Sequence, residues 1–368
     1  MYLKLFLYLS FNSLIFSFIN NHKINKSLKL YSDYKNIKTF LDEQKWKNPE
    51  MEDVFTIINN IQQACGDINK IMRKISTYKQ DKKSISSITN KILKSAISAS
   101  NKVNLVISKE ETNRCYLSDN MAFNGNYVVV YNSLDSTVNI GSVNIGSVNS
   151  GSVNINSDNN ILDNINSGLP TGTIFGIYKK NQFQKFNSNS EIKRGNELIV
   201  AGYCLYSAST NLVLTYGLGV HRFIFDDIYN KFILINNNIT IPQYGNIYSF
   251  NHAEHKQWTL KVQNYYNSLH NYKNIASYTD SIVVNTHNIL FNGGICCYPS
   301  TFYNTNGNIN LVYQANPLSK IIIDAGGKSI NGTHNILNLK INDIHQQTPL
   351  IFGSLEQINY FENYLTKF

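Results

Sequence analysis

The chain is poor in proline, in charged residues and in long hydrophobic runs. Only 6 of its 368 residues are proline, and Asp, Glu, Lys and Arg together make up 15%. Beyond the first residues, no uninterrupted apolar stretch reaches the roughly 18 residues that a membrane-spanning helix requires, which excludes a polytopic membrane protein. Hydrophobic residues still account for 42% of the chain, so a globular protein with a sizeable core is expected.

Cysteine is also scarce. The five cysteines, Cys65, Cys115, Cys204, Cys296 and Cys297, are unevenly spaced and form no CxxC pair. This excludes a disulfide framework and disfavours a zinc site. The adjacent Cys296 and Cys297 are interpreted as small buried apolar residues.

The charge balance is basic, with a formal net charge of +9. Much of the excess lies in the lysine-rich residues 23–38 and 70–94. A solvated surface is the favoured interpretation, with a patch for nucleic acid or an anionic membrane as the alternative. We therefore expect no nucleic-acid partner.

The N-terminal segment has the composition of a leader. In residues 1–19 one lysine precedes an apolar stretch that Asn12 and Ser13 interrupt, and residues 20–45 are rich in Lys, Asn and Ser. A signal or transit peptide over residues 1–45 is predicted, for secretory entry or a plastid-type organelle. The mature form would then carry no membrane segment. The alternative is a disordered extension on a cytoplasmic protein.

Two helices and several strands are predicted from periodicity. Apolar residues recur every three or four positions over residues 52–76 and again over 85–97, which is typical of amphipathic helices. Buried strands are expected at 103–107, 127–131, 173–178, 197–204 and 212–215. This alternation of helices and strands indicates an α/β (α+β) layered architecture.

A short tandem repeat interrupts this pattern. Residues 139–158 read NIGSV, NIGSV, NSGSV, NINSD. A five-residue period rich in Gly and Ser is too short for a solenoid unit and cannot build a core. The low-complexity insertion at about 141–168 is predicted to be a surface loop.

Eight segments, taken in order, resemble the class I fructose-1,6-bisphosphatases. YVVVYNSLDSTVNI (127–140) is similar to that family's strand and DPLDGSSNID loop, and TGTIFGIYKK (171–180) to its TGSIFGIY segment. The others are ELIVAGYCLYSAST (197–210), ITIPQYGNIYSFN (239–251), NGGICCYPS (292–300), NGNINLVYQANPLS (306–319), DAGGK (324–328) and DIHQQTPLIFGS (343–354). The resemblance covers about residues 50–368.

The resemblance implies a sugar-phosphatase fold with layers in the order αβαβα. It implies two family domains, over residues 46–193 and 194–368, and assembly as a tetramer, so a homo- or hetero-oligomer is expected. It also implies magnesium-dependent hydrolysis of the 1-phosphate of fructose 1,6-bisphosphate. Mg²⁺ ions held by carboxylate oxygens would activate water and neutralise the leaving group in that reaction.

The implied site residues follow from matching positions. Glu110, Glu111, Asp135 and the carbonyl of Leu134 match metal ligands, with Glu111 and Asp135 as the catalytic pair. Substrate contacts match Ser136, Thr137, Asn251, Tyr278 and Tyr298. The sugar bisphosphate is thus the expected ligand.

The chain departs from the family where charge is needed. The first aspartate of DPLDG is Asn132, and the glutamate of GKLRLLYE is Gln314. In the family, the loop before the second helix carries a catalytic aspartate, which aligns here with Ser86, or alternatively with Asp81. Further charged pocket positions of the family are occupied by Ser277, Asn285, Asn288, Asn308 and Asn310.

These replacements predict weakened metal binding. Two unit charges about 4 Å apart interact by about 4 kcal/mol at an effective dielectric near 20, and an amide lacks that charge. We expect a catalytically impaired family member that binds a sugar phosphate or regulates a partner. The alternative is an active magnesium-dependent phosphatase for fructose 1,6-bisphosphate or a seven-carbon bisphosphate.

Overall fold

The computed structural model describes residues 34–74, 84–111, 115–117, 125–135, 170–180, 193–270 and 273–367. Most of the predicted leader, the five-residue repeat and the insertion at 141–168 lie outside these residues.

An eight-stranded sheet forms the first half of the protein. Its order is β2-β1-β3-β4-β5-β6-β7-β8, with β1 and β3 parallel and the other neighbours antiparallel. The strands are β1 (Val103–Ser108), β2 (Cys115–Tyr116), β3 (Tyr127–Asn132), β4 (Thr171–Lys179), β5 (Leu198–Tyr206), β6 (Asn211–Thr215), β7 (Val220–Asp226) and β8 (Lys231–Asn236). All five predicted strands are confirmed. The sheet continues on both sides of residues 193 and 194, the predicted domain boundary.

Both faces of this sheet are buried, as β3 shows. Val129 and Tyr131 pack into one hydrophobic core, whereas Val128 and Val130 pack into another. Successive side chains of a strand point to opposite faces, so a run of apolar residues requires a layer on each side.

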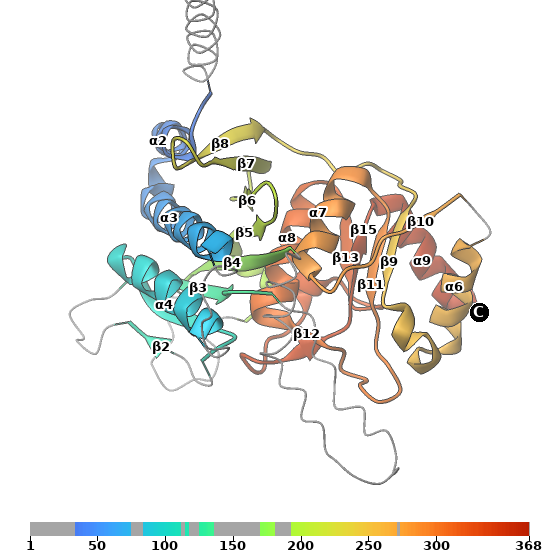
Figure 1. Ribbon diagram of the computed structural model, residues 1–368. Helices are drawn as coiled ribbons and strands as arrows, with labels where there is room; N and C mark the ends of the chain where they lie inside the picture. Colours follow the sequence, from blue (N-terminus) through green and yellow to red (C-terminus); the bar gives the residue numbers. More distant parts are fainter. Residues whose placement is uncertain are drawn as a thin grey trace, which may run out of the picture.

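Three helices cover the first face (Figure 1). They are α2 (Ile37–Lys47), α3 (Glu52–Lys74) and α4 (Ser84–Ala99), with the short 3₁₀ helix η1 (Pro49–Met51) between the first two. The two predicted helices are confirmed as α3 and α4. In α2, Ile37, Phe40 and Leu41 are buried in the core, so this part of the predicted leader is an integral part of the fold.

A central helical layer separates the two sheets. It contains α7 (Ile282–Asn292), α8 (Asn316–Asp324) and the π-helix η5 (Leu311–Ala315). Apolar side chains of these helices share one core with the second face of the first sheet.

The second sheet has five strands in the order β10-β9-β11-β15-β13. These are β9 (Ile247–Phe250), β10 (Ile275–Ala276), β11 (Ile295–Tyr298), β13 (Lys328–Ile330) and β15 (Leu350–Gly353). Its outer face is covered by α6 (Leu260–Leu269) and α9 (Leu355–Lys367). Smaller elements are β12 (Ile309–Asn310), β14 (Gln347–Thr348) and the 3₁₀ helices η3 (Gly195–Glu197), η4 (His252–Gln257) and η6 (Ile336–Asn338).

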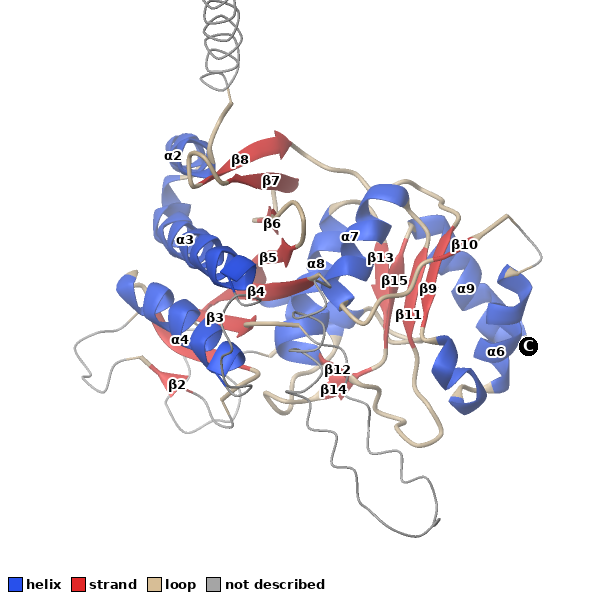
Figure 2. Ribbon diagram, viewed as in Figure 1, coloured by secondary structure: helices blue, strands red, loops and turns tan. Residues whose placement is uncertain are grey.

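The layers therefore follow one another as helices, sheet, helices, sheet, helices (Figure 2). This is the predicted αβαβα arrangement. Cys65, Cys204, Cys296 and Cys297 are buried free thiols, as interpreted for the last two. Among the described residues, no helix combines the length and apolar character needed to cross a membrane.

Candidate active site

Two parallel strands bring the predicted metal ligands to one edge of the first sheet. Ser108 at the end of β1 pairs with Tyr131 of β3, and the backbone N–H of Lys109 donates to the carbonyl of Tyr131 at 3.3 Å. Glu110 and Glu111 follow β1, and Ser133–Asp135 follow β3. Carboxyl ends of neighbouring parallel strands are where open α/β sheets commonly place ligands.

Glu110 is held by two serines. Ser133 Oγ donates to Glu110 Oε1 at 2.6 Å, and Ser86 Oγ donates to the same atom at 3.2 Å. The other oxygen, Oε2, is buried and has no hydrogen-bond partner within the described part of the chain. Burial raises the pKa of Glu110, and the hydroxyl of Ser133 only partly offsets this.

Glu111 is compensated by a cation of the protein itself. Lys94 of α4 places its Nζ 3.1 Å from Glu111 Oε1, and Asn90 Nδ2 donates to that oxygen at 3.4 Å. The predicted catalytic carboxylate is therefore engaged by α4.

Asp135 lies at the N-terminus of α7. Its Oδ2 accepts hydrogen bonds from the backbone N–H of Val283 at 2.8 Å and from Ser281 Oγ at 3.0 Å. Its Oδ1 is buried without a hydrogen-bond partner among the described residues. Burial raises the pKa of Asp135 to about 6, against these two hydrogen bonds. The helix N-terminus, where partial positive charge accumulates, thus stabilises this carboxylate.

Two amides stand where the resemblance implies metal-binding carboxylates. Asn132 is fully buried, and neither its Oδ1 nor its Nδ2 has a hydrogen-bond partner in the described ranges. The side chain of Gln314 instead contacts the backbone four residues earlier, where its Oε1 accepts from the N–H of Asn310 at 3.1 Å. Asn310 caps η5 by accepting from the N–H groups of Val312 and Tyr313 at 2.8 and 3.1 Å.

The predicted sugar contacts gather at the second sheet. Tyr298 ends β11 and Asn251 follows its parallel neighbour β9. The rings of Tyr278 and Tyr298 lie 6.4 Å apart, and Asn285 Nδ2 donates to the Tyr298 hydroxyl at 2.7 Å. Asn251, Tyr278 and Tyr298 therefore belong to one region. Asn251 also caps η4 and donates from Nδ2 to Glu254 Oε1 at 3.0 Å.

The remaining predictions concern the loop after β3. Ser136 and Thr137 lie outside the described residues. Leu134 is buried in the first core. The carbonyls on either side of it accept hydrogen bonds from β4, that of Ser133 from Thr173 Oγ1 and that of Asp135 from Thr171 Oγ1, both at 2.7 Å.

The described donors are too few for a cluster of Mg²⁺ ions. Each Mg²⁺ is usually held by one or two carboxylates together with water and substrate phosphates, so a cluster needs several carboxylates. The described residues include no group of three or more His, Cys, Asp or Glu side chains arranged to hold a metal. Glu111 is paired with Lys94, and Asn132 and Gln314 are uncharged. Glu110 and Asp135 each use one oxygen for protein hydrogen bonds.

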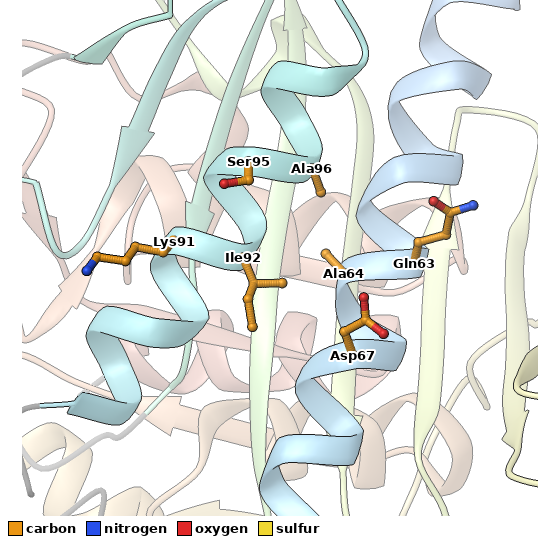
Figure 3. A pocket seen from close by; sticks show the side chains of 7 residues that line it. All are labelled: Gln63, Ala64, Asp67, Lys91, Ile92, Ser95 and Ala96. Carbon is orange, nitrogen blue, oxygen red and sulfur yellow. The ribbon is translucent and has the colours of Figure 1, made fainter.

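A groove elsewhere does not coincide with these residues. It has a volume of about 480 Å³ and lies between α3 and α4, lined by Gln63, Ala64, Asp67, Lys91, Ile92, Ser95 and Ala96. Figure 3 shows Ile92 and Ala64 between the two helices, whereas Lys91 points away from α3. None of them is a predicted site residue.

Several site residues were not predicted from the sequence. Ser281, which caps α7 and contacts Asp135, directly precedes the apolar residues 282–284, and this is a recognisable helix-start signal. Lys94 lies on the polar side of a predicted helix and carries no local signal for its contact with Glu111. Glu254 follows Asn251 by three residues, a spacing typical of a capped first turn.

Comparisons with known proteins agree across sequence and structure. The family description "Fructose-1-6-bisphosphatase, N-terminal domain" matches residues 159–237, and "Fructose-1-6-bisphosphatase, C-terminal domain" matches residues 241–366. The chloroplastic fructose-1,6-bisphosphatase of Brassica napus is 30% identical over 362 residues, covering 89% of this chain and 81% of the relative. The cytosolic enzyme of the same plant is 28% identical, covering 89% of this chain and 94% of the relative.

Solved structures show the same relationship. The apo form of Leishmania major fructose-1,6-bisphosphatase superposes with a TM-score of 0.77 at 26% identity, covering 90% of this chain and 99% of the other. Its T-state gives a TM-score of 0.78 at 25% identity, with coverage of 91% and 99%. With matching domains, relatives and fold, the chain belongs to the fructose-1,6-bisphosphatase family.

Proposed function

We propose that this family member binds a sugar phosphate and that its hydrolytic activity is weak or absent. The proposal concerns the site between the ends of β1 and β3 and the N-terminus of α7. Its physical basis is a shortage of negative charge for holding divalent ions.

Asn132 carries the proposal. Its side chain is completely buried, and both of its polar atoms are without a hydrogen-bond partner within the described residues. A buried polar group that is not satisfied costs free energy. An amide in this position supplies an oxygen to a cation without neutralising any of its charge, so a bound Mg²⁺ would keep a large uncompensated charge in a dry site.

The neighbouring contacts support the same conclusion. Lys94 already neutralises Glu111 at 3.1 Å, and Gln314 already satisfies the N–H of Asn310 at 3.1 Å. These groups form internal contacts of the protein, and an ion bound by the same oxygens would compete with those contacts.

Phosphate release from fructose 1,6-bisphosphate by the full chain, with Mg²⁺ or Mn²⁺, tests this proposal. We expect turnover well below ~1 s⁻¹, the lower end of ordinary enzymes. Turnover at or above that rate would refute impaired catalysis. Calorimetric titration with a sugar phosphate tests the proposed binding, because a purely structural protein would show no heat of binding.

A second candidate function is a working sugar bisphosphatase. It is favoured by two buried carboxylate oxygens, Glu110 Oε2 and Asp135 Oδ1, that have no hydrogen-bond partner in the described part of the chain. Such oxygens are suitable ligands for a hard cation. The same assay decides between the two functions, with a seven-carbon bisphosphate as a second substrate.

Oligomerisation is a separate proposal. Family membership makes a homo- or hetero-oligomer the expected assembly. Light scattering after gel filtration measures it directly, and a mass near the 41.9 kDa of one chain would contradict it.

A further inference from the structure

Arg222 of β7 lies on the second face of the first sheet, beside α7. On this strand Phe223 and Phe225 pack into the first core and Val220 packs into the second. Because successive side chains of a strand alternate, Arg222 shares the face of Val220. Its guanidinium carbon is 5.0 Å from the ring centroid of Phe291 on α7. The cation is thus partly buried against an aromatic ring, a contact that arginine makes readily.

Two neutral amides hold the guanidinium in place. Arg222 Nε donates to Asn211 Oδ1 at 2.7 Å, and Nη1 donates to Asn236 Oδ1 at 3.3 Å. These asparagines belong to β6 and β8, the strands on either side of β7. The Nη2 atom has no hydrogen-bond partner among the described residues. A planar guanidinium fixed in this way is prepared to donate two parallel hydrogen bonds to an oxyanion.

No neighbouring group neutralises the charge of Arg222 within the described part of the chain. Burial lowers its pKa, and no described carboxylate opposes this effect. The nearby Tyr203 hydroxyl and His287 Nδ1 lie 2.9 Å apart and partner each other. Burial raises the pKa of Tyr203 and lowers that of His287 to about 4, so both side chains are neutral near pH 7. A partly buried cation without a counter-charge is unfavourable, and an anion would relieve this cost.

An apolar strip of three isoleucines continues from Arg222. Ile224 is two residues further along the same face of β7, and it pairs with Ile233 of β8. Ile235, beside Asn236, is 46% exposed. None of the three packs into a hydrophobic core of the described residues. This Ile strip is therefore apolar surface next to an unpaired cation.

These features define the chemistry of a ligand. One uncompensated positive charge is balanced by one negative charge, whereas a phosphate dianion would leave an excess. The two coplanar oxygens of a carboxylate match the guanidinium edge. A hydrocarbon chain attached to that carboxylate would remove apolar surface of the Ile strip from water.

We propose that Arg222 and the Ile strip bind an aliphatic monocarboxylate, with its carboxylate on the guanidinium and its hydrocarbon chain along Ile224 and Ile233. This site is separate from the candidate active site. β7 is four strands away from β3 in the sheet order (Figure 1), which corresponds to about 19 Å at the usual spacing of strands. The inference therefore does not depend on the proposed function.

Calorimetric titrations of the full chain with octanoate, acetate, 1-octanol and inorganic phosphate test the inference. Octanoate carries both the charge and the chain, and each other probe lacks one of them. We expect octanoate to bind at least ~10-fold more tightly than acetate, because only octanoate covers the Ile strip. It should also bind more tightly than 1-octanol and inorganic phosphate.

Two variants separate the charge from the chain. Arg222→Gln should lower the affinity for octanoate at least ~10-fold, because an amide does not balance a carboxylate. Ile224→Thr keeps a branched side chain of similar shape and should lower the affinity for octanoate ~3-fold while leaving that for acetate unchanged. The matched control is Arg194→Gln, which removes the charge of an exposed arginine before η3 and leaves every affinity unchanged.

Absence of octanoate binding by the unmodified chain overturns the inference, including the case in which a second copy of the chain covers this face. Equal binding of acetate and octanoate overturns it as well, as does unchanged octanoate affinity in a folded Arg222→Gln variant. If Arg222→Gln does not fold, Ile224→Thr decides in its place, and an unchanged octanoate affinity there has the same meaning. Binding of a fructose phosphate should be the same with and without octanoate, so the result of the phosphate-release assay leaves this inference unaffected.

Discussion

The side-chain carbonyl of Gln314 accepts a hydrogen bond from the backbone N–H of Asn310 at 3.1 Å. The residue that aligns with a metal-binding glutamate therefore stabilises the start of η5, and Asn310 caps the same element through the N–H groups of Val312 and Tyr313. A glutamate oxygen can accept the same hydrogen bond, so Gln314→Glu restores a charge at this position without removing the contact.

The double variant Asn132→Asp/Gln314→Glu restores two carboxylates. Without metal it should be destabilised by about 3 kcal/mol, since like charges would be buried next to Glu110 and Asp135. Mg²⁺ should then raise its melting temperature and increase phosphate release by ~100-fold over the unmodified chain. Differential scanning fluorimetry and a phosphate assay, each with and without Mg²⁺, measure both effects.

The control for this variant is Asn267→Asp/Gln63→Glu, which makes the same chemical changes at two exposed positions. It should leave stability and activity as they are. If the unmodified chain is already fully active and the restored variant is no faster, the native site is competent and the proposed function is wrong.

The sequence was informative where structure depends on local periodicity. The apolar spacing in α3 and the continuous apolar run of β3 both identify their elements, because burial of one helix face or two strand faces leaves a repeat in the chain. The order of family-like segments then identifies the layers. The composition of residues 37–45 resembles that of the preceding residues and predicts a leader, yet Phe40 and Leu41 are buried in the core.

The polar contacts of the site could not be predicted in this way. Lys94 and Glu111 are 17 residues apart, and Asp135 and Val283 are 148 residues apart. Such pairs depend on how the layers pack, and no local repeat encodes them. Only the caps, such as Ser281 before α7, carry a signal in the adjacent sequence.

Asp135 should make the protein less stable as the pH rises. Burial raises its pKa from 3.8 to about 6 in the folded protein, so the folded state holds a proton that the unfolded chain releases earlier. The free energy of unfolding is then highest below about pH 4 and falls by up to ~3 kcal/mol by about pH 6. Asp135→Asn should remove this fall and be more stable than the unmodified chain at neutral pH, with a small decline of the same sign left from Glu110.

Urea unfolding at a series of pH values measures how the free energy of unfolding changes with pH. The control is Asp42→Asn, an exposed change on α2. An unchanged slope in Asp135→Asn would show that the carboxylate is already ionised in the folded state. Adding Mg²⁺ to the unmodified chain is a second test. A bound ion would lower the pKa of Asp135 and make the free energy of unfolding less dependent on pH.

His287 should produce the opposite dependence. Its Nδ1 is 2.9 Å from the hydroxyl of Tyr203, and burial, followed by the charge of Arg222, lowers its pKa to about 4. The unfolded chain therefore takes up a proton at higher pH than the folded protein does. Stability should decline by up to ~3 kcal/mol as the pH falls from about 6.5 to about 4.

His287→Gln keeps a hydrogen-bonding group near Tyr203 and should reduce that acid-side loss. In the unmodified chain, His287 and Asp135 make the free energy of unfolding change with pH in opposite directions over nearly the same pH range. Removing one of the two groups therefore reveals the pH dependence that the other causes. His334→Gln, at an exposed position, is the control. The assignment fails if His287→Gln loses as much stability in acid as the unmodified chain.

Gly172 should be intolerant of a side chain because α7 lies directly against it. A Cβ at this position would be 2.7 Å from Val283 Cγ1 and 2.8 Å from the carbonyl of Cys204. The carbonyl of Gly172 also accepts from the N–H of Asp135 at 2.6 Å. Gly172→Ala should therefore cost about 2 kcal/mol of stability and displace the start of α7 from the carboxylate that it stabilises.

The double variant Gly172→Ala/Val283→Ala should recover part of this loss, which a double-mutant cycle in urea measures. The displaced N–H of Val283 would no longer support the ionised form of Asp135. The free energy of unfolding of Gly172→Ala should therefore fall more steeply with rising pH than that of the unmodified chain. A Gly172→Ala variant with native stability and an unaltered pH dependence would contradict the close contact.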